Sequence, residues 1–347
     1  MRIYEEEFGK IDNKSVASFT LVNDNGMEVS AITYGCTITK VMVPDKNGTV
    51  ENVVLGFDSI GDYINHSPYF GCVVGRVAGR INGASFELDG KEYNLVKNEN
   101  GNTLHSGPNS FSNVVWDAAM IEEDHLVGVE FSYRSPDGEL GFPGNVDMIV
   151  RYTLNNENEV LITYEGTTDQ KTILNVTNHS YFNLSGDVKR DVLDHTLRMN
   201  SSQFLELDEE FLPTGNYLEV ENTPFDFRTG RQIRDGVTSS HQQNKLVGEG
   251  YDHPFLLQGD KEILLTDSES GRTVKVETDE VSVVVYSSNS LQGDFSIQGQ
   301  KARKYLGICL ETQGLPDAIH HPHFPSITID EGEKYHTQTK FIFNVDK

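Results

Sequence analysis

Cysteine is scarce in this sequence, and the few cysteines lie far apart. Cys36, Cys72 and Cys309 are the only three in 347 residues, and none belongs to a C-x-x-C pair. An odd number of widely spaced cysteines argues against a disulfide framework and against a structural zinc site. The sequence therefore indicates a reducing compartment, and we expect a cytoplasmic protein.

Long hydrophobic runs are also missing. The longest candidate, residues 281–286, is far shorter than the roughly 18 apolar residues that a membrane-spanning helix needs. The first seven residues, MRIYEEE, lack the apolar core of a secretory signal. We therefore expect neither a membrane partner nor a secretory leader.

Basic residues are few relative to acidic ones. The chain has 28 lysines and arginines against 53 aspartates and glutamates, which gives a net charge of −25. Such a surface repels a phosphate backbone, so we expect no nucleic-acid partner. Hydrophobic residues make up 37% and charged residues 23%, which is typical of a folded protein rather than a disordered one.

Helical periodicity is scarce, whereas strand periodicity is frequent. Apolar and polar side chains alternate in residues 146–154, 159–165 and 273–277, as they do in strands with one face in a core. β-Branched and aromatic runs occupy a further set of segments, residues 17–22, 31–43, 127–133, 281–286, 305–311 and 339–345. Residues 203–211 and 239–247 have room for a helical turn or two.

This pattern predicts the fold class. No linker, repeat or shift of composition divides the chain, so we expect one domain over residues 1–347. Strand after strand joined by glycine-rich turns predicts an all-β fold with little helix, a large antiparallel β-sandwich. Periodicity alone leaves closure into a barrel open.

The standard catalytic and cofactor motifs are absent. The sequence contains no G-x-G-x-x-G, no G-x-x-x-x-G-K-[ST], no G-x-S-x-G and no H-E-x-x-H. His320, His321 and His323 resemble a metal cluster, but Pro322 interrupts regular structure there and no matching ligand set lies at metal spacing. We interpret that segment as a loop near the rim of a site, and we expect no metal.

Two glycine-rich segments carry charged side chains. In residues 75–81, GRVAGRI, Arg76 and Arg80 each follow a glycine, so backbone bends could aim both guanidinium groups into a cleft. Taken alone, two surface arginines are the simpler interpretation. In residues 250–255, GYDHPF, Asp252 ends a glycine-rich loop, where an aspartate usually forms a turn.

Histidine occurs in two polar contexts. His105 lies in a turn-rich loop, and because the chain has eleven histidines a lone loop histidine is more often simply solvated. His179 lies in residues 173–182, where the apolar face and the polar face of a strand separate. The polar face consists of Asn175, Thr177, His179 and Tyr181. Such a face lines a wet cleft or faces solvent, and periodicity does not distinguish the two.

A carboxylate ends another strand. In residues 305–314, Leu306, Ile308 and Leu310 form the apolar face. Glu311 shares the opposite face with Gly307 and Cys309, whose small side chains leave room for a ligand above the sheet.

Together these segments resemble the galactose mutarotase (aldose 1-epimerase) family. The matching stretches, in the order of the family, are GRVAGRI at 75–81, NTLHSG at 102–107, NVTNHSYFNL at 175–184, GYDHPF at 250–255 and LETQGLPDA at 310–318. The resemblance runs from about residue 19 to the C-terminus, and NHSYFNL and ETQ are its most specific parts.

The resemblance implies a large β-sandwich that binds a free hexose in an open cleft. It also implies interconversion of the α and β anomers of hexoses such as galactose and glucose, without a metal or a nucleotide cofactor. In the roles that it implies, Glu311 is the general base and His179 the general acid. The substrate-binding positions that it implies are His105, Arg80, Asp252, Gly79 and Tyr181.

The chemistry suits these residue types. Ring opening takes a proton from the O1 hydroxyl and gives one to the ring oxygen O5. A carboxylate with a reference pKa of about 4.3 is ionised at neutral pH and accepts a proton. A histidine with a reference pKa near 6.5 is partly protonated and can donate one. We expect nearby carboxylates to favour the charged form of His179.

Two departures from the family concern substrate contacts. The family often has an asparagine where this chain has Gly79, which removes one direct sugar contact. Many members also carry a glutamine in the strand that here reads VVYSSN, residues 284–289, with Val284 at its start. Both changes bear on substrate affinity and leave the acid–base pair in place.

Other functions remain as alternatives. A hexose-6-phosphate 1-epimerase needs extra lysine or arginine for the phosphate, and the motifs offer only Arg76 and Arg80. A non-catalytic carbohydrate-binding module has no reason to keep both His179 and Glu311. A glycosidase usually needs two carboxylates about 5–10 Å apart, which Glu311 and Asp252 could supply. We expect a monomer or a homodimer.

Overall fold

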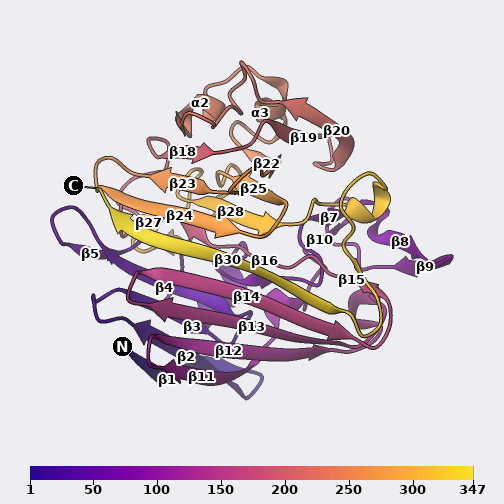
Figure 1. The fold of residues 1–347 in the computed structure, drawn as a ribbon, viewed down its shortest axis with the longest axis horizontal. Helices are drawn as coiled ribbons and strands as arrows, with labels where there is room; N and C mark the ends of the chain where they lie inside the picture. The colour runs from indigo at the N-terminus through magenta and orange to yellow at the C-terminus, as the bar shows by residue number, and fades with distance from the viewer. Residues whose placement is uncertain (347) are drawn as a thin grey trace.

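A nine-stranded antiparallel sheet forms one layer of the computed structural model, which describes residues 1–346 (Figure 1). Its strands, in spatial order, are β11 (Asp117–Glu123), β12 (Leu126–Ser135), β13 (Val146–Asn155), β14 (Glu159–Thr168), β30 (Lys334–Val345), β24 (Arg272–Thr278), β23 (Ile263–Thr266), β18 (Thr196–Met199) and β21 (Arg231–Gln232). The sheet ends at β11 and β21 and so stays open.

Two smaller antiparallel sheets form the facing layer. The five-stranded sheet consists of β1 (Arg2–Ile11), β2 (Lys14–Val22), β3 (Glu28–Ile32), β4 (Thr37–Pro44) and β5 (Val50–Asn52). The six-stranded sheet has the order β17 (Tyr181–Phe182), β28 (Ile308–Gln313), β25 (Ser282–Tyr286), β22 (Asp252–Leu256), β19 (Gln203–Leu207) and β20 (Pro213–Glu219).

Short ladders and helices complete the described chain. The two-stranded ladders are β6 (Val73–Val74) with β16 (Thr177–Asn178), β7 (Arg80–Ile81) with β10 (Thr103–Leu104), β8 (Ser85–Leu88) with β9 (Lys91–Asn94), β15 (Thr172–Ile173) with β29 (Thr328–Ile329) and β26 (Ser296–Ile297) with β27 (Gln300–Lys301). The helices are α1 (Ile60–His66), α2 (Arg234–Val237), α3 (Gln242–Leu246) and four 3₁₀ turns, η1 (Asn82–Ala84), η2 (Phe111–Asn113), η3 (Glu139–Gly141) and η4 (Ala318–His320). Within residues 1–346, no helix has the length and apolarity to cross a membrane.

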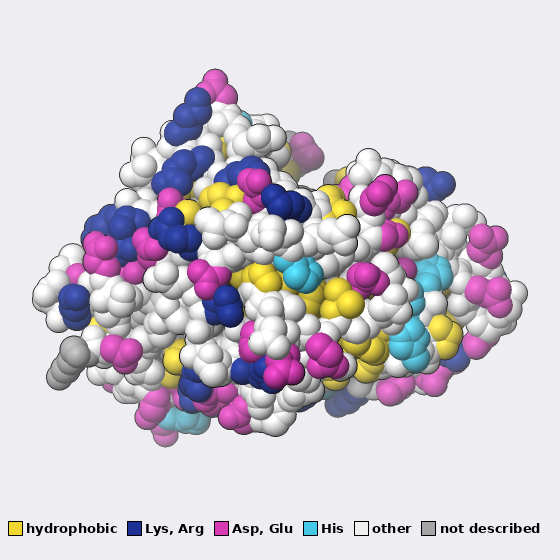
Figure 2. Space-filling view, turned by 90° about the horizontal axis from the view of Figure 1, so that it is seen from above, with side chains coloured by type: hydrophobic (Ala, Val, Ile, Leu, Met, Phe, Trp, Pro, Cys, Tyr) yellow, Lys and Arg dark blue, Asp and Glu magenta, His cyan; other side chains and the backbone are white. Residues whose placement is uncertain are grey.

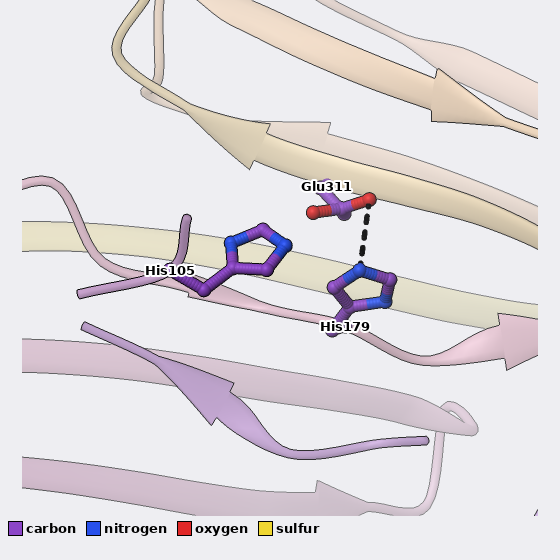
Figure 3. Close-up of side chains that lie close together, drawn as sticks. All are labelled: His105, His179 and Glu311. Carbon is purple, nitrogen blue, oxygen red and sulfur yellow. Dashed lines mark ion pairs between the residues drawn. The ribbon is translucent and has the colours of Figure 1, made fainter. Parts of the chain in front are cut away.

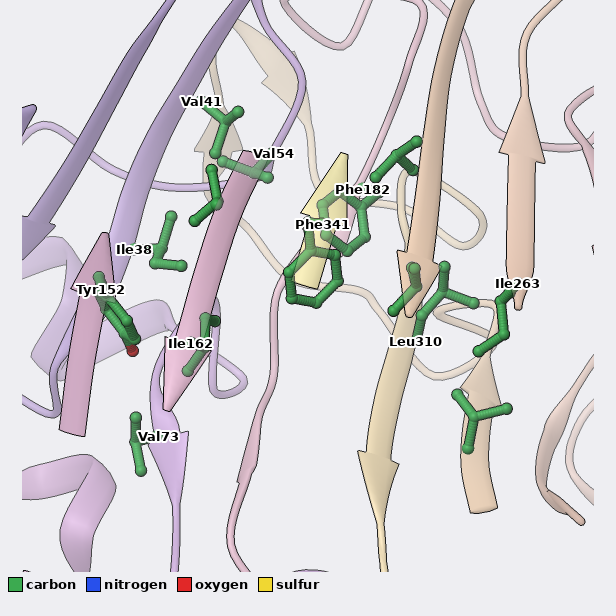
Figure 4. Close-up of a cluster of buried hydrophobic side chains, with 14 of the residues drawn as sticks. Ile38, Val41, Val54, Val73, Tyr152, Ile162, Phe182, Ile263, Leu310 and Phe341 are labelled. Carbon is green, nitrogen blue, oxygen red and sulfur yellow. The ribbon is translucent and has the colours of Figure 1, made fainter. Parts of the chain in front are cut away.

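The hydrophobic core lies between the nine-stranded sheet and the two facing sheets. Phe131 of β12 contacts Phe19 of β2, with ring centroids 6.3 Å apart. Phe341 of β30 contacts Phe182 of β17 at 5.3 Å. Figure 4 shows Phe182 and Phe341 meeting in this layer. Because each fully buried side chain of this kind contributes about 1.5–3 kcal/mol, these contacts hold the layers together.

Strand β28 shows how the fold positions polar groups. Leu310 is buried in the core cluster between the sheets. Glu311, the next residue, lies on the opposite face of the strand, because successive side chains of a strand alternate. The outward face of the six-stranded sheet is therefore free to carry a site.

The all-β antiparallel sandwich is confirmed, with two differences in detail. Residues 31–43 form β3 and β4 rather than one strand, because Gly35 (φ 64°) and Cys36 (φ 48°) adopt left-handed backbone that reverses the chain. The helical turn expected in residues 203–211 is wrong, since that segment begins with β19, in which Phe204 is buried. Helix α3 lies within residues 239–247, as expected.

The surface carries the acidic surplus of the sequence. Acidic side chains are spread over the whole face shown in Figure 2, and histidines lie beside hydrophobic side chains in its right half. Some exposed carboxylates are paired, as Asp147 is with Arg134 (3.0 Å) and Asp58 with Lys40 (2.8 Å). Exposed pairs of this kind contribute only about 0–1 kcal/mol each.

Candidate active site

A pocket lies on the outward face of the six-stranded sheet. Its volume is about 230 Å³, which is below the roughly 300–1,000 Å³ of pockets for drug-sized ligands. The seven residues that the sequence places in a site all line it: Gly79, Arg80, His105, His179, Tyr181, Asp252 and Glu311. Segments far apart in the sequence therefore meet around one pocket, which has the size for a small ligand.

Strand register builds the floor of the pocket. Glu311 of β28 lies opposite Val284 of β25, and Val284 lies opposite Pro254 of β22. Two residues further along β25, Tyr286 lies opposite Asp252 of β22. Since residues two apart share a face of a strand, both rows face the pocket.

Glu311 and His179 form a buried pair at the centre of the pocket. The Nε2 atom of His179 lies 3.5 Å from Oε1 of Glu311, and both side chains are about 95% shielded from solvent, with relative exposures of 6% and 5%. Figure 3 shows the carboxylate above the His179 ring, with His105 beside them. A carboxyl group and an imidazole this close can exchange a proton with each other, and both line the pocket.

The ring of His179 is held from several sides. Its backbone N–H donates to the carbonyl of Cys72 (2.9 Å), and its own carbonyl accepts from Gly71 (3.0 Å). The imidazole stacks against Tyr181, at 5.1 Å and 22°, and against Tyr69, at 5.7 Å and 23°. The ring plane is therefore fixed by two aromatic contacts.

The polar residues before His179 do not line the pocket, which corrects the expectation of one continuous polar face. The hydroxyl of Thr177 donates to the carbonyl of Thr312 (2.9 Å). The amide of Asn175 exchanges two hydrogen bonds with the backbone of Gly314 (2.8 and 3.1 Å). These bonds tie the segment that carries His179 to the strand that carries Glu311.

Gly79 and His105 clamp each other through two hydrogen bonds. The backbone N–H of Gly79 donates to Nδ1 of His105 (3.1 Å), and the N–H of His105 donates to the carbonyl of Gly79 (2.9 Å). Because Nδ1 accepts, the proton of the neutral ring lies on Nε2. Burial lowers the pKa of His105 well below its usual range, which keeps the ring neutral. His105 is therefore a hydrogen-bond donor.

Arg80 is oriented by Glu99. Its Nε and Nη2 atoms donate to the two carboxylate oxygens of Glu99 (2.5 and 2.9 Å), and its guanidinium lies over the ring of Phe211 at 5.2 Å. This fork-to-fork pairing leaves Nη1 available for a ligand.

Burial also sets the charge of the central pair. Desolvation raises the pKa of Glu311 well above its usual range, and Asp252 raises it further while Arg80 lowers it. Desolvation lowers the pKa of His179 to about 4. The protein alone therefore favours the neutral ring of His179, contrary to the expectation that carboxylates keep it charged, because loss of solvation is the main effect. Burial thus favours the protonated carboxyl group of Glu311 and the neutral ring of His179.

Asp252 is a second carboxyl group with an altered pKa. Desolvation raises its pKa to about 6, against the opposing effect of Arg80. Asp252 is thus ionised at neutral pH and can accept hydrogen bonds from hydroxyl groups.

Three of these side chains approach the spacing of metal ligands. One ligand atom each from His105, His179 and Glu311 lies within 4.8 Å of the others. A metal on Nε2 of His105 requires the ring proton to sit on Nδ1, where it would meet the N–H of Gly79. The hydrogen bonding of His105 therefore does not suit a metal site.

Arg76 lies neither in the pocket nor on the surface, so both interpretations of this residue, in a cleft or on the surface, are wrong. Its guanidinium is buried, and Nε donates to the hydroxyl of Ser135 (2.7 Å). It also donates to the carbonyls of Pro143 (2.8 Å) and Gly144 (2.9 Å). Arg76 stabilises a loop through these hydrogen bonds, whereas Arg80 lines the pocket.

The small residues of the β28 segment leave no space for a ligand, which is a further correction. A Cβ atom on Gly307 would lie 2.8 Å from the Cβ of Tyr181. The Sγ atom of Cys309 lies 3.5 Å from Nδ1 of His179. The space above them is filled by Tyr181 and His179, which are thereby positioned.

The histidine-rich loop adjoins the pocket. Pro316 lines the pocket, and His320 follows it with Nδ1 2.6 Å from Oδ1 of Asp317. The Nε2 atom of His323 lies 2.9 Å from the carbonyl of Gly215.

Sequence reasoning missed several lining residues. Tyr69 and Phe211 belong to no recognisable motif, and Tyr286 lies in residues 284–289, where the sequence pointed to Val284 instead. Glu99 had a weak signal, because it precedes the histidine loop by a few residues and offers a partner for an arginine.

Comparisons with known proteins identify the family of the chain. The family model described as aldose 1-epimerase matches residues 17–341. The galactose mutarotase of Bos taurus is 40% identical over 338 residues, which cover 95% of each chain. The aldose 1-epimerase of Haemophilus influenzae is 37% identical over 342 residues, with 97% of this chain and 98% of that protein covered.

Solved structures give the same result. The crystal structure of galactose 1-epimerase from Lactobacillus acidophilus NCFM superposes with a TM-score of 0.90 and 31% identity, covering 100% of this chain and 99% of that one. Agreement in sequence and in fold extends over almost the whole chain. The chain therefore belongs to the aldose 1-epimerase family.

Proposed function

We propose that this aldose 1-epimerase, an isomerase, interconverts the α and β anomers of free hexoses such as galactose and glucose, with Glu311 and His179 transferring the protons. The observation that carries the proposal is the buried contact of 3.5 Å between Nε2 of His179 and Oε1 of Glu311. A carboxylate and an imidazole this close can serve two oxygens of one sugar, O1 and O5.

The reaction proceeds by opening and closing the ring. Glu311 takes the proton from the O1 hydroxyl, a C1–O1 double bond forms, and the C1–O5 bond breaks as His179 gives its proton to O5. Rotation about C1–C2 then presents the other face of the aldehyde. Ring closure returns the proton of O5 to His179 and the proton of Glu311 to O1.

Ring opening requires an ionised Glu311 and a protonated His179. Hydroxyl groups of a bound sugar donate hydrogen bonds to the carboxylate, which favours its ionised form and the transfer of the proton to His179. After ring opening, Glu311 is protonated and His179 is neutral, which is the charge state that burial favours. We propose that this preference lowers the free energy of the open-chain intermediate.

The other predicted residues hold the sugar. His105 donates from Nε2, Arg80 donates from Nη1, and the carboxylate of Asp252 accepts from a hydroxyl. Tyr181 fixes the plane of the acid, as its stacking on His179 supports. Gly79 contributes its backbone clamp on His105 rather than a side chain.

A phosphorylated hexose fits the pocket less well. Among the described lining residues, Arg80 is the one lysine or arginine, and Glu99 already binds it. A phosphate dianion would need at least one further cation.

Polarimetry of freshly dissolved α-D-galactose and α-D-glucose tests the proposal. The enzyme should speed the decay of optical rotation well above the uncatalysed rate, and the Glu311→Gln protein should not. Decay at the background rate with both sugars, from a folded wild-type protein, would overturn the proposal. Faster turnover of hexose 6-phosphates would favour the phosphate alternative.

We further propose a cytoplasmic, one-domain enzyme over residues 1–347 that acts as a monomer or a homodimer. Its three cysteines are unpaired and buried, which suits a reducing compartment. Light scattering coupled to size exclusion distinguishes the two oligomeric states.

A further inference from the structure

Gln313 occupies the end of the pocket floor. It lies two residues after Glu311 on β28 and therefore on the same outward face. It is one of the residues that line the pocket, although only 1% of its surface is exposed to solvent. The Cα atoms of Glu311 and Gln313 are roughly 6.6 Å apart, as strand geometry dictates.

The side-chain amide of Gln313 has no hydrogen-bond partner. Both Oε1 and Nε2 are buried, and neither bonds to any group in residues 1–346. The hydroxyl of its cross-strand neighbour Ser282 donates to the backbone carbonyl of Gln313 (2.6 Å) and not to its side chain. Leu256, opposite Ser282 in the same row, is apolar.

Another buried glutamine shows the contrast. Gln243 accepts from the N–H of Leu207 (2.9 Å) and donates to its carbonyl (2.9 Å). Buried amides are normally bonded in this way, because an unbonded polar group loses its solvation without compensation. An amide with both ends unbonded beside a catalytic pocket therefore points to a ligand.

At its end of the floor, Gln313 is the group that can recognise a hydroxyl, because Asp252 and Tyr286 lie at the other end. Val284, which lies opposite Glu311, and Pro254 beyond it have no side-chain hydrogen-bonding groups. A hexose whose O1 lies at Glu311 can place another hydroxyl over Gln313, because its hydroxyls point outward all around the ring.

We propose that the side-chain amide of Gln313 binds one hydroxyl group of the sugar ring and thereby helps to determine which aldoses the enzyme accepts. The amide accepts a hydrogen bond at Oε1 and donates one at Nε2, so it recognises a hydroxyl in both of its roles. This assignment rests on the proposed function of the same pocket.

Gln313→Met tests the assignment, because methionine keeps the shape of the side chain and removes its hydrogen bonds. For D-galactose and D-glucose, we expect kcat/KM to fall about 3- to 30-fold, mainly through a higher KM. A panel of 2-, 3-, 4- and 6-deoxy sugars then identifies the hydroxyl. For the sugar that lacks the contacted hydroxyl, wild type and variant should have the same kcat/KM.

Stability provides a second readout. Removing an unbonded buried amide should leave Tm unchanged or raise it by about 1–3 °C. Thr172→Val is the matched control, because Thr172 is fully buried with an unbonded hydroxyl and does not line the pocket. Its Tm should respond in the same direction, and its kinetics should stay those of the wild type.

Three results would overturn the assignment. They are an unchanged kcat/KM in Gln313→Met, an equal fall with every sugar of the panel, and failure of both Gln313→Met and Gln313→Leu to fold. A wild-type protein that does not catalyse mutarotation would instead refute the proposed function itself.

Discussion

The buried contact between Glu311 and His179 is the central feature at the scale of single residues. Glu311→Gln keeps the shape of the side chain and removes the basic oxygen, and His179→Asn removes the donor to O5. Each change should lower kcat by about 10²–10⁴ with a smaller effect on KM. Polarimetry gives the rates, and thermal unfolding checks that both variants remain folded. Near-normal turnover in a folded Glu311→Gln protein would show that another group is the base, with Asp252 first to test.

Asp252 should give the enzyme an acid limb. Because its pKa is raised to about 6, the carboxyl group becomes protonated as the pH falls through 6 and loses the charge that strengthens its hydrogen bond with the sugar. We expect KM to rise and kcat/KM to fall on that side.

The Asp252→Asn protein isolates this limb. Its kcat/KM should be lower than that of the wild type at neutral pH and should not change across pH 6. The measurement is kcat/KM against pH for both proteins. A limb near pH 6 that persists in Asp252→Asn belongs to another group.

His105 supports a prediction about metals. Since Gly79 donates to Nδ1 of His105, this ring is a donor rather than a metal ligand. Activity should therefore survive exhaustive treatment with EDTA followed by dialysis. A rate that disappears with EDTA and returns with one specific metal would contradict the assignment of His105.

At the scale of elements, the short ladder of β7 and β10 sets the geometry of the pocket wall. Gly79 precedes it with φ 77°, and a Cβ atom there would lie 2.9 Å from the Cβ of Pro316. Gly79→Ala should therefore shift the clamp on His105 and lower kcat/KM about 10- to 100-fold.

Gly90→Ala is the matched control for that change. Gly90 has the same φ of 77°, and a Cβ atom on it would have no neighbour within 4 Å. Both variants should lose roughly 1–2 kcal/mol of stability from the left-handed backbone, and only Gly79→Ala should lose activity. Equal kinetics in the two variants would show that the clamp does not position the imidazole.

The elements also show how far the sequence can be interpreted. Alternation assigned Leu310 and Glu311 to opposite faces of one strand, because that depends only on local geometry. It failed in residues 173–182, where β16 and β17 are separate and Asn175 and Thr177 bond to distant backbone. Arg76 and Arg80 have the same local sequence context, and only tertiary contacts make one structural.

At the scale of the whole molecule, Arg272 connects the nine-stranded sheet, the five-stranded sheet and the segment that follows β17. This buried side chain, 1% exposed, starts β24 of the nine-stranded sheet. It donates to Oε2 of Glu51 in the five-stranded sheet (2.8 Å) and to the carbonyls of Val43 (3.3 Å) and Leu184 (3.2 Å).

Arg272→Met should therefore reduce the free energy of unfolding by about 3–5 kcal/mol, because it leaves the Glu51 carboxylate buried with one partner fewer. Arg134→Met, which breaks an exposed pair with Asp147, should cost less than about 1 kcal/mol. Urea denaturation of both variants measures the difference. Similar losses would mean that the buried pair contributes no more than a surface one.

The fold class followed from the sequence, but the strand order did not. Period-two alternation shows that strands have one buried face, and little else is needed to predict a sandwich. Nothing local shows that β30, near the end of the chain, pairs between β14 and β24. Such pairings depend on which distant faces are complementary in the assembled core.

The residues that line the pocket extend from Pro68 to Pro316 in the sequence. The complete pocket therefore forms late in synthesis and in folding. Every wall requires the closure of a long loop of chain, so the native topology has a high contact order and should form slowly. A nascent chain has no working pocket until residue 316 has emerged from the ribosome. Recovery of mutarotation after dilution from denaturant should accordingly follow the last folding phase and lag behind the recovery of β-sheet circular dichroism.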